Sequence, residues 1–210
     1  MTKTILFDFW GTLVENGVWS PIKQVRNILQ IREPFSDYVI KMENAFMTKP
    51  HSSLKEGFQE VAAAFNIDAP EDVIDELVGL WNKSWMLAKP YPEVEEILKR
   101  LKETHQLVLI SNTDCNSILN VLEKFKLEQY FDHRFLSFEV GKIKTDPEFL
   151  QQVITELKLN EEDCILVGDS VLSDIKCAEQ AGIKSVLIDR RNRRDHDPKI
   201  STLRELEKYL

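Results

Sequence analysis

The stretch "ILFDFWGTLV" (residues 5–14) joins an apolar run to a single carboxylate and a tight turn. Asp8 follows the apolar residues directly, and Gly11 and Thr12 form the turn. Two positions beyond Asp8, where a second acid would complete a nucleophile and general-acid pair, the chain carries Trp10. The stretch therefore predicts a buried strand that ends in a carboxylate and a tight turn, and it raises the question of what Trp10 changes.

Short apolar runs recur along the chain with helical segments between them. After the first run come "LVLISN" (107–112), "RFLSFE" (134–139), "CILVGD" (164–169) and "SVLIDR" (185–190). Runs of four to six residues rich in Leu, Ile, Val and Phe are typical of strands buried on both faces. Strand-helix alternation predicts an α/β fold with a parallel sheet and helices on both of its faces.

One long interval breaks this alternation. Between Thr12 and Pro90 there is no strand-like run, and amphipathic spacing predicts helices around 19–31, 34–48, 53–65 and 70–86. We expect a helical module inserted after the first strand, over the carboxyl ends of the strands, where open α/β sheets bind ligands. In this division residues 1–14 and 88–210 form the α/β core, and residues 15–87 form a helical cap.

Composition and charge exclude several classes of function. The formal net charge is −8, which argues against general binding to nucleic acid, because the phosphate backbone would repel the protein. The three cysteines have no CxxC spacing and indicate a reducing compartment. With no signal-peptide cleavage pattern and no apolar stretch of 18 residues, we expect a cytoplasmic protein that does not enter a membrane. The sequence does not indicate an oligomeric state.

Polar residues follow the predicted strands at the edge where such a sheet binds ligands. They are Asp8, Ser111 with Asn112, and Asp169; Lys144 precedes a helix in the loop "GKIKTDPEF" (141–149), and Asp174 begins the helix after Asp169.

Phosphate transfer to a carboxylate explains this set of residues. A carboxylate nucleophile and a phosphate are both anionic, so a divalent cation must bridge them, and Mg2+ prefers oxygen ligands. Asp8 and Asp169 are the predicted ligands, supported by Asp174 directly or through water. Ser111 and the groups after it, including Asn112, would hold phosphate oxygens. Lys144 would neutralise the remaining charge and orient Asp8.

Four motifs in this order resemble the haloacid dehalogenase-like superfamily. They are "DFWGTL" (8–13), "LVLISNT" (107–113), "GKIKTDPEF" (141–149, with Thr145 where Pro is common) and "VGDSVLSD" (167–174). The resemblance covers nearly the whole chain, and the helical insertion is similar to the family's first-type cap, named C1. It implies a Rossmann-like core, an aspartyl nucleophile at Asp8 in a phosphate-binding turn with Thr12, and Mg2+ that also takes the main-chain carbonyl of Trp10.

The first motif departs from the family pattern at Trp10. In phosphatases of the family a second Asp protonates the leaving alcohol and then activates water, help worth about 10²–10⁴ in rate. An indole is a donor only and cannot do this. A Mg2+-dependent hydrolase of a small phosphorylated compound remains our preferred interpretation, with a good leaving group or a substitute acid. Candidates for that substitute are Glu15, Lys49 and His51.

Three alternatives stay open. The superfamily's 2-haloacid dehalogenases carry an aromatic residue at the position of Trp10, but "GDSVLSD" differs from their metal-free motif, and Arg26 and Arg32 are candidates only by region for their substrate-binding arginine. Phosphonoacetaldehyde hydrolases are related, but bulky Trp10 and the lack of a recognisable cap lysine motif argue against them. A binding module without turnover is the third, although Asp8, Lys144 and the two later aspartates would be penalised by desolvation at a retired site.

Overall fold

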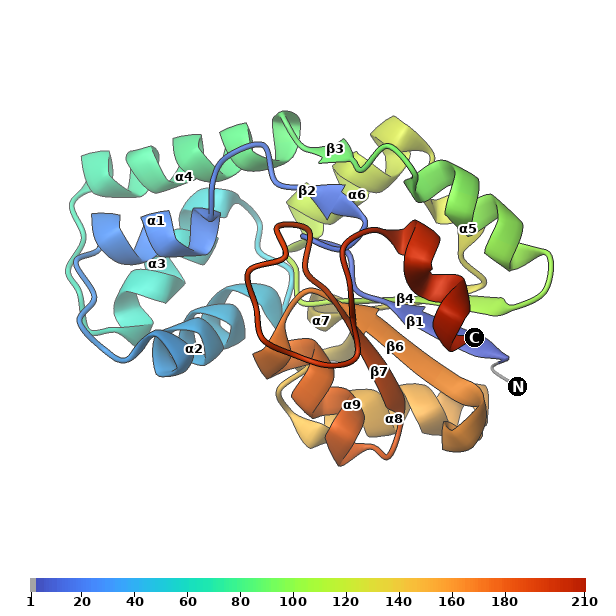
Figure 1. The fold of residues 1–210 in the computed structure, drawn as a ribbon. Coiled ribbons are helices and arrows are strands. Elements are labelled where there is room, and N and C mark those ends of the chain that lie inside the picture. The colour runs from blue at the N-terminus through green and yellow to red at the C-terminus, as the bar shows by residue number, and fades with distance from the viewer. Residues whose placement is uncertain (1–2) are drawn as a thin grey trace.

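The computed structural model describes residues 3–210 and is built around a six-stranded sheet (Figure 1). In spatial order the strands are β5 (His133–Leu136), β4 (Gln106–Ser111), β1 (Thr4–Phe7), β6 (Cys164–Gly168), β7 (Lys184–Ile188) and β8 (Lys199–Ile200). All neighbouring pairs are parallel. This arrangement confirms the predicted α/β fold. The first two residues of the expected core segment lie outside the described part of the chain.

Helices cover both faces of the sheet, as the doubly apolar strands predict. Ile5 and Phe7 of β1 pack in one hydrophobic cluster, and Leu6 between them packs in another on the opposite face. The first face carries α5 (Val94–Lys102), α6 (Cys115–Phe125) and a C-terminal 3₁₀ helix (Leu203–Tyr209); the second carries α8 (Pro147–Leu157) and α9 (Lys176–Gln180). Shorter turns of helix lie at α7 (Ser137–Val140), Glu128–Tyr130, Glu161–Asp163 and, as a π-helical turn, Val171–Ile175.

Four helices between the first and second core strands form a separate group, here called the helical insertion (Figure 1). They are α1 (Pro21–Ile28), α2 (Phe35–Met47), α3 (Leu54–Ala64) and α4 (Glu71–Met86). Their apolar faces meet in a cluster of their own that includes Tyr38, Phe46 and Trp81. None of the helices in the described chain is both long and apolar enough to span a membrane.

Several details differ from the sequence predictions. The predicted strand 134–139 is wrong in its second half, because the chain leaves the sheet after Leu136 and turns into α7. Ser137 causes this turn by bonding the backbone of Thr113 twice, as acceptor from its N–H at 2.9 Å and as donor to its carbonyl at 3.1 Å. Strand β8 was not predicted, nor was the antiparallel pair β2 (Val14–Glu15) and β3 (Lys89–Pro90) at the two ends of the insertion.

Candidate active site

Asp8 lies at the carboxyl end of β1, in the middle of the sheet. It is 5% exposed, and its two oxygens accept hydrogen bonds from Thr12 Oγ1 at 2.9 Å and Lys144 Nζ at 2.6 Å. The turn after Asp8 requires glycine at position 11, where φ is +81° and a Cβ atom would lie 2.6 Å from Asp169 Oδ2. The local sequence thus holds the carboxylate rigidly at the end of its strand.

Lys144 is a buried cation between two carboxylates. Its Nζ donates to Asp8 Oδ1 and, at 2.5 Å, to Asp174 Oδ1, while the residue itself is 2% exposed. Burial alone would lower the pKa of Lys144, but the adjacent Asp174 and Asp8 outweigh it and hold that pKa above its usual range. Lys144 therefore stays charged and fixes the orientation of both acids.

Asp174 lies in the first turn of the helical segment that follows β6, as the sequence predicted. It lies inside the π-helical turn that precedes α9, where it is completely buried and accepts a hydrogen bond from the Ser170 N–H at 2.9 Å. A Cβ atom at Gly168 would lie 2.3 Å from Asp174 Cγ, so glycine at the end of β6 makes room for this carboxylate. The π turn thereby directs Asp174 towards Lys144 and away from solvent.

Asp8, Asp169 and Asp174 form a compact group of acids. One carboxylate oxygen from each lies within 4.8 Å of the other two. Burial raises the pKa of Asp8 to about 6 against the opposing effect of Lys144, and loss of solvent together with the neighbouring acids raises the pKa of Asp169. Lys144 and the guanidinium of Arg194, which lies 3.9 Å from Asp169, cannot neutralise three carboxylates, and an all-oxygen ligand set of this kind suits Mg2+. The residues present therefore fit the cation that the sequence led us to expect.

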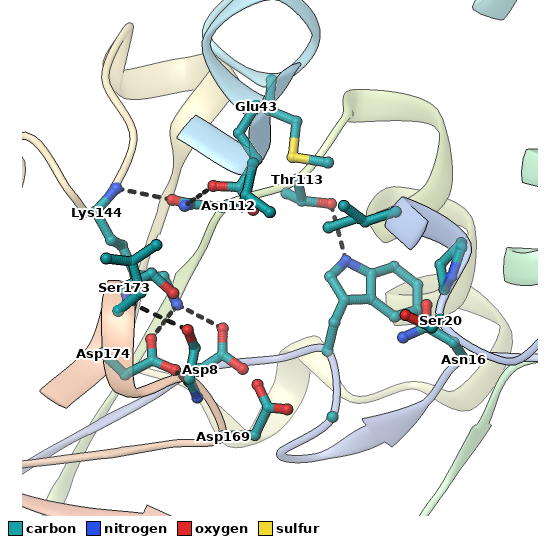
Figure 2. Close-up of a pocket in the computed structure, with 18 of the residues that line it drawn as sticks. Asp8, Asn16, Ser20, Glu43, Asn112, Thr113, Lys144, Asp169, Ser173 and Asp174 are labelled. Carbon is teal, nitrogen blue, oxygen red and sulfur yellow. Dashed lines mark hydrogen bonds and ion pairs between the residues drawn. The ribbon is translucent and has the colours of Figure 1, made fainter. Parts of the chain in front are cut away.

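These groups line a cavity of about 420 Å³ between the carboxyl ends of the strands and the helical insertion. Figure 2 shows Asp8, Asp169 and Asp174 on one side of this cavity and Glu43 with Asn112 on the other. The cavity is thus formed by both parts of the molecule.

The residues at the end of β4 and just after it differ in whether they line the cavity. Among the described residues its lining includes Asn112 and Thr113 but not Ser111, which is fully buried at the end of the strand. The Asn112 side chain accepts a hydrogen bond from the Lys144 N–H at 2.8 Å. Asn112 therefore joins the second and third motifs, and it reaches the cavity where Ser111 does not.

Trp10 lines the cavity and is held in place on both sides. Its Nε1–H donates to Thr113 Oγ1 at 3.1 Å, and its ring packs edge-on against Phe9 with centroids 5.0 Å apart. The indole fills space where a second acid would stand, and its one polar hydrogen is already used. The side chain therefore offers no proton to a substrate.

Glu43 is one of several cavity residues that were not predicted from the sequence. It comes from α2, is 7% exposed, and accepts a hydrogen bond on Oε2 from Asn112 Nδ2 at 2.8 Å. A signal was present, because Glu43 falls on the apolar face of α2 between Met42 and Phe46, where an acid is unusual.

The substitute acids suggested by the sequence lie elsewhere. Lys49 pairs with Glu60 at 2.8 Å, and the His51 ring contacts the Phe46 carbonyl at 3.1 Å. Glu15 is exposed on β2. Within the described chain, none of these three candidates lines the cavity.

The arginines considered for a dehalogenase are also outside the cavity. Arg26 donates to the Glu33 carbonyl at 2.6 Å and packs against the ring of Phe35. Of the described arginines only Arg194, from the core, contributes to the lining, so neither Arg26 nor Arg32 does so.

Sequence comparison assigns the family. The model of the haloacid dehalogenase-like hydrolase family matches residues 5–188, and the chain therefore belongs to that family. A glyceraldehyde 3-phosphate phosphatase of Pyrococcus furiosus is 24% identical over 191 residues, which cover 88% of this chain and 79% of that protein. Two other curated relatives match over only 53% and 56% of their own length.

Solved structures share the fold at low identity. A 2-haloacid dehalogenase from Pseudomonas syringae superposes with a TM-score of 0.66 at 20% identity, covering 99% of this chain and 97% of that one. A haloacid dehalogenase-family enzyme from Bacteroides thetaiotaomicron, in complex with magnesium and inorganic phosphate, gives 0.63 at 20% identity over 94% and 98%. At these identities the likeness concerns the fold alone.

Proposed function

We propose that this chain is a Mg2+-dependent hydrolase of a small phosphorylated compound, with Asp8 as the nucleophile. One observation carries the proposal: three carboxylates and a buried lysine converge on one cavity at the carboxyl ends of the strands. The P. furiosus relative named as a phosphatase supports the same class of substrate. Asp8, Asp169, Asp174 and the carbonyl of Trp10 are the proposed ligands of the cation.

The proposed chemistry follows from what each residue can do. Asp8 Oδ attacks phosphorus, the bond to the leaving oxygen breaks, and an aspartyl-phosphate forms that water later hydrolyses. Bound Mg2+ would supply Lewis-acid neutralisation of the phosphate charge. Lys144 and Thr12 hold Asp8 in position, and Asn112 and the neighbouring amides are the proposed contacts of the phosphate oxygens, because Thr12 and Ser111 do not belong to the cavity lining.

The alternative of carbon–halogen hydrolysis is less well supported. A haloacid presents a carboxylate that needs a cation; of the two charged side chains that the insertion presents to the cavity, Lys23 could serve, but the buried carboxyl of Glu43 would repel a carboxylate. The three free cysteines, Cys115, Cys164 and Cys177, accord with the cytoplasmic location that belongs to this proposal.

Turnover of a panel of substrates tests the proposal. We expect phosphate release from an aryl phosphate and from acetyl phosphate with Mg2+, and its loss with EDTA. Asp8→Asn should lower the rate by at least about 10³-fold, since the nucleophile is gone. Asp68→Asn, at an exposed position between α3 and α4, is the matched control and should retain activity.

Two results would overturn the proposal. EDTA-resistant chloride release from 2-chloropropionate would assign dehalogenation instead. No turnover of any substrate, with Mg2+ still bound, would indicate a binding module.

A further inference from the structure

Among the described residues, those of the core of this site do not offer a proton donor for the leaving oxygen. Trp10 occupies the position of the second acid, and its N–H is committed to Thr113. Asp8, Asp169 and Asp174 form the proposed cation site and so are not available to protonate a leaving oxygen. A proton donor must therefore come from another residue that reaches the same cavity.

Glu43 is a carboxyl that reaches this cavity from the insertion. It lines the cavity with Asp8 and Lys144, and it lies on the side facing Asp8 in Figure 2. One oxygen, Oε2, is held by Asn112 Nδ2, and that amide is fixed in turn by the Lys144 backbone. The carboxyl is thus positioned by the core although it belongs to α2.

The surroundings of Glu43 favour a carboxyl that can both hold and release a proton. Among the described residues no Lys or Arg forms an ion pair with it. Burial raises the pKa of Glu43 to about 7; the Asn112 hydrogen bond and Lys144 oppose this, while Asp174 and Asp8 add to it. The other charged groups that line the cavity are Lys23, Asp114, Asp169 and Arg194.

We propose that Glu43 is the general acid and base of this enzyme, and that it performs from the insertion the proton transfers that Trp10 cannot. This inference rests on the proposed phosphohydrolase function. A buried carboxyl at such a position is otherwise hard to explain, because it adds an acid to a cavity already crowded with acids.

Two balanced steps follow. In the first, Asp8 Oδ forms a bond to phosphorus, the bond from phosphorus to the alcohol oxygen breaks, and that oxygen takes the proton of Glu43. In the second, the Glu43 carboxylate takes a proton from water as the water oxygen bonds to phosphorus. The bond between phosphorus and Asp8 then breaks, inorganic phosphate leaves, and Glu43 is protonated again.

Leaving groups of different basicity test the role of Glu43. We expect Glu43→Gln to lower turnover of an alkyl phosphate by about 10²–10⁴-fold, because an alkoxide needs a proton to leave. The first step with 4-nitrophenyl phosphate should change far less, since nitrophenolate leaves unprotonated. Without a base for the second step, the variant should release a burst of nitrophenolate equal to the enzyme concentration and accumulate phosphoenzyme.

The pH dependence gives a second readout. The acid form of Glu43 is needed for the first step, so wild-type kcat/KM for the alkyl phosphate should fall as pH rises through about 7. Glu43→Gln should lose this descending limb. Glu43→Asp, which keeps a carboxyl, should retain the limb at reduced rate.

Controls separate this inference from the proposed function. Glu60→Gln removes an acid of α3 that pairs with Lys49 outside the cavity, and it should leave all rates unchanged. Asp8→Asn should abolish the burst itself. If Asp8→Asn keeps its activity, the proposed function fails. If Asp8→Asn is inactive but Glu43→Gln slows alkyl and aryl phosphates equally without a burst, or slows neither, only the role of Glu43 fails.

Discussion

At the scale of single residues, Lys144 is the group whose removal has the clearest consequence. It is the cation held between Asp8 and Asp174, and all three residues are buried. We expect Lys144→Met to lower the free energy of unfolding by about 3–5 kcal/mol, because two buried carboxylates lose their counter-charge. Added Mg2+ should restore more stability in the variant than in the wild type, since a bound cation replaces the missing charge. Urea unfolding with and without Mg2+ measures both effects.

Lys142 offers a matched control in the same loop. It pairs with Glu148 at 3.4 Å near the surface, so Lys142→Met should change stability by less than about 1 kcal/mol. Equal losses in the two variants would contradict the argument that burial makes Lys144 important.

Some residues of the cavity could be predicted from the sequence, and others could not. That Asp8, Asp169 and Lys144 would lie together could be predicted, because the strands before the two acids are recognisable and the carboxyl ends of parallel strands share one edge. Glu43 could not be placed, because its direction depends on how α2 is rotated against the sheet. That rotation is set by contacts in the insertion's own cluster, such as those of Phe46, between residues far apart in the sequence.

At the scale of elements, burial decides which strands could be predicted. Strands of four or more residues in which most residues are buried, such as β1 and β6, appear in the sequence as clear apolar runs. Strands β2, β3 and β8 have two residues each, which is too few to show any periodicity. The end of β5 was missed because the hydrogen bonds of Ser137 with Thr113 join segments that are distant in the sequence.

The connection between core and insertion depends on a glycine with no room for a side chain. The Gly17 N–H bonds the Ser84 carbonyl at 2.8 Å, and a Cβ at position 17 would lie 2.5 Å from Leu87 Cβ. We expect Gly17→Ala to lower the free energy of unfolding by about 1–3 kcal/mol, because the two connecting segments must move apart. Thermal or urea unfolding measures this loss.

Gly79, in the same insertion, is a glycine with room for a side chain. It lies in the middle of α4, and a Cβ there would meet no atom within 4 Å. Gly79→Ala should raise the free energy of unfolding by about 0.5–1 kcal/mol, since alanine is the better helix former. A loss of stability in Gly79→Ala, or none in Gly17→Ala, would contradict this account of the connection.

At the scale of the whole molecule, two bodies with separate hydrophobic clusters enclose one cavity. The sheet supplies the proposed nucleophile and cation ligands, and the insertion supplies Glu43. The proposed reaction therefore requires the two bodies to be held together. Polar contacts that join them include Glu43 to Asn112, Trp81 Nε1–H to Asp114 Oδ2 at 2.8 Å, and Lys124 Nζ to the Met86 carbonyl at 2.9 Å.

Trp81 allows the closure of the two bodies to be tested separately from the chemistry. Its ring packs edge-on against Phe46 and Phe58 in the insertion, while its N–H crosses to Asp114 at the start of α6. Trp81→Phe keeps an aromatic ring and leaves one Asp114 oxygen unpaired, at a cost of about 1–3 kcal/mol to the closed arrangement. We expect KM for a phosphorylated substrate to rise more than kcat falls, because the closed state is less populated but its chemistry is intact.

Trp85→Phe is the control for Trp81→Phe, because it also replaces an indole by a phenyl ring. The Trp85 ring packs against the hydrophobic clusters of both bodies, a contact that phenylalanine keeps in part, whereas its Nε1–H bonds Asn82 at 3.0 Å within α4, so the hydrogen bond that Trp85→Phe removes does not join the two bodies. Amide exchange in α6 and α4 should become faster in Trp81→Phe and change less in Trp85→Phe, since opening exposes the surfaces between insertion and core. Equal acceleration in both variants would mean that the Trp81–Asp114 bond does not hold the insertion closed. The cavity would then depend on the packing of α4 against α6 and on the bond between Glu43 and Asn112.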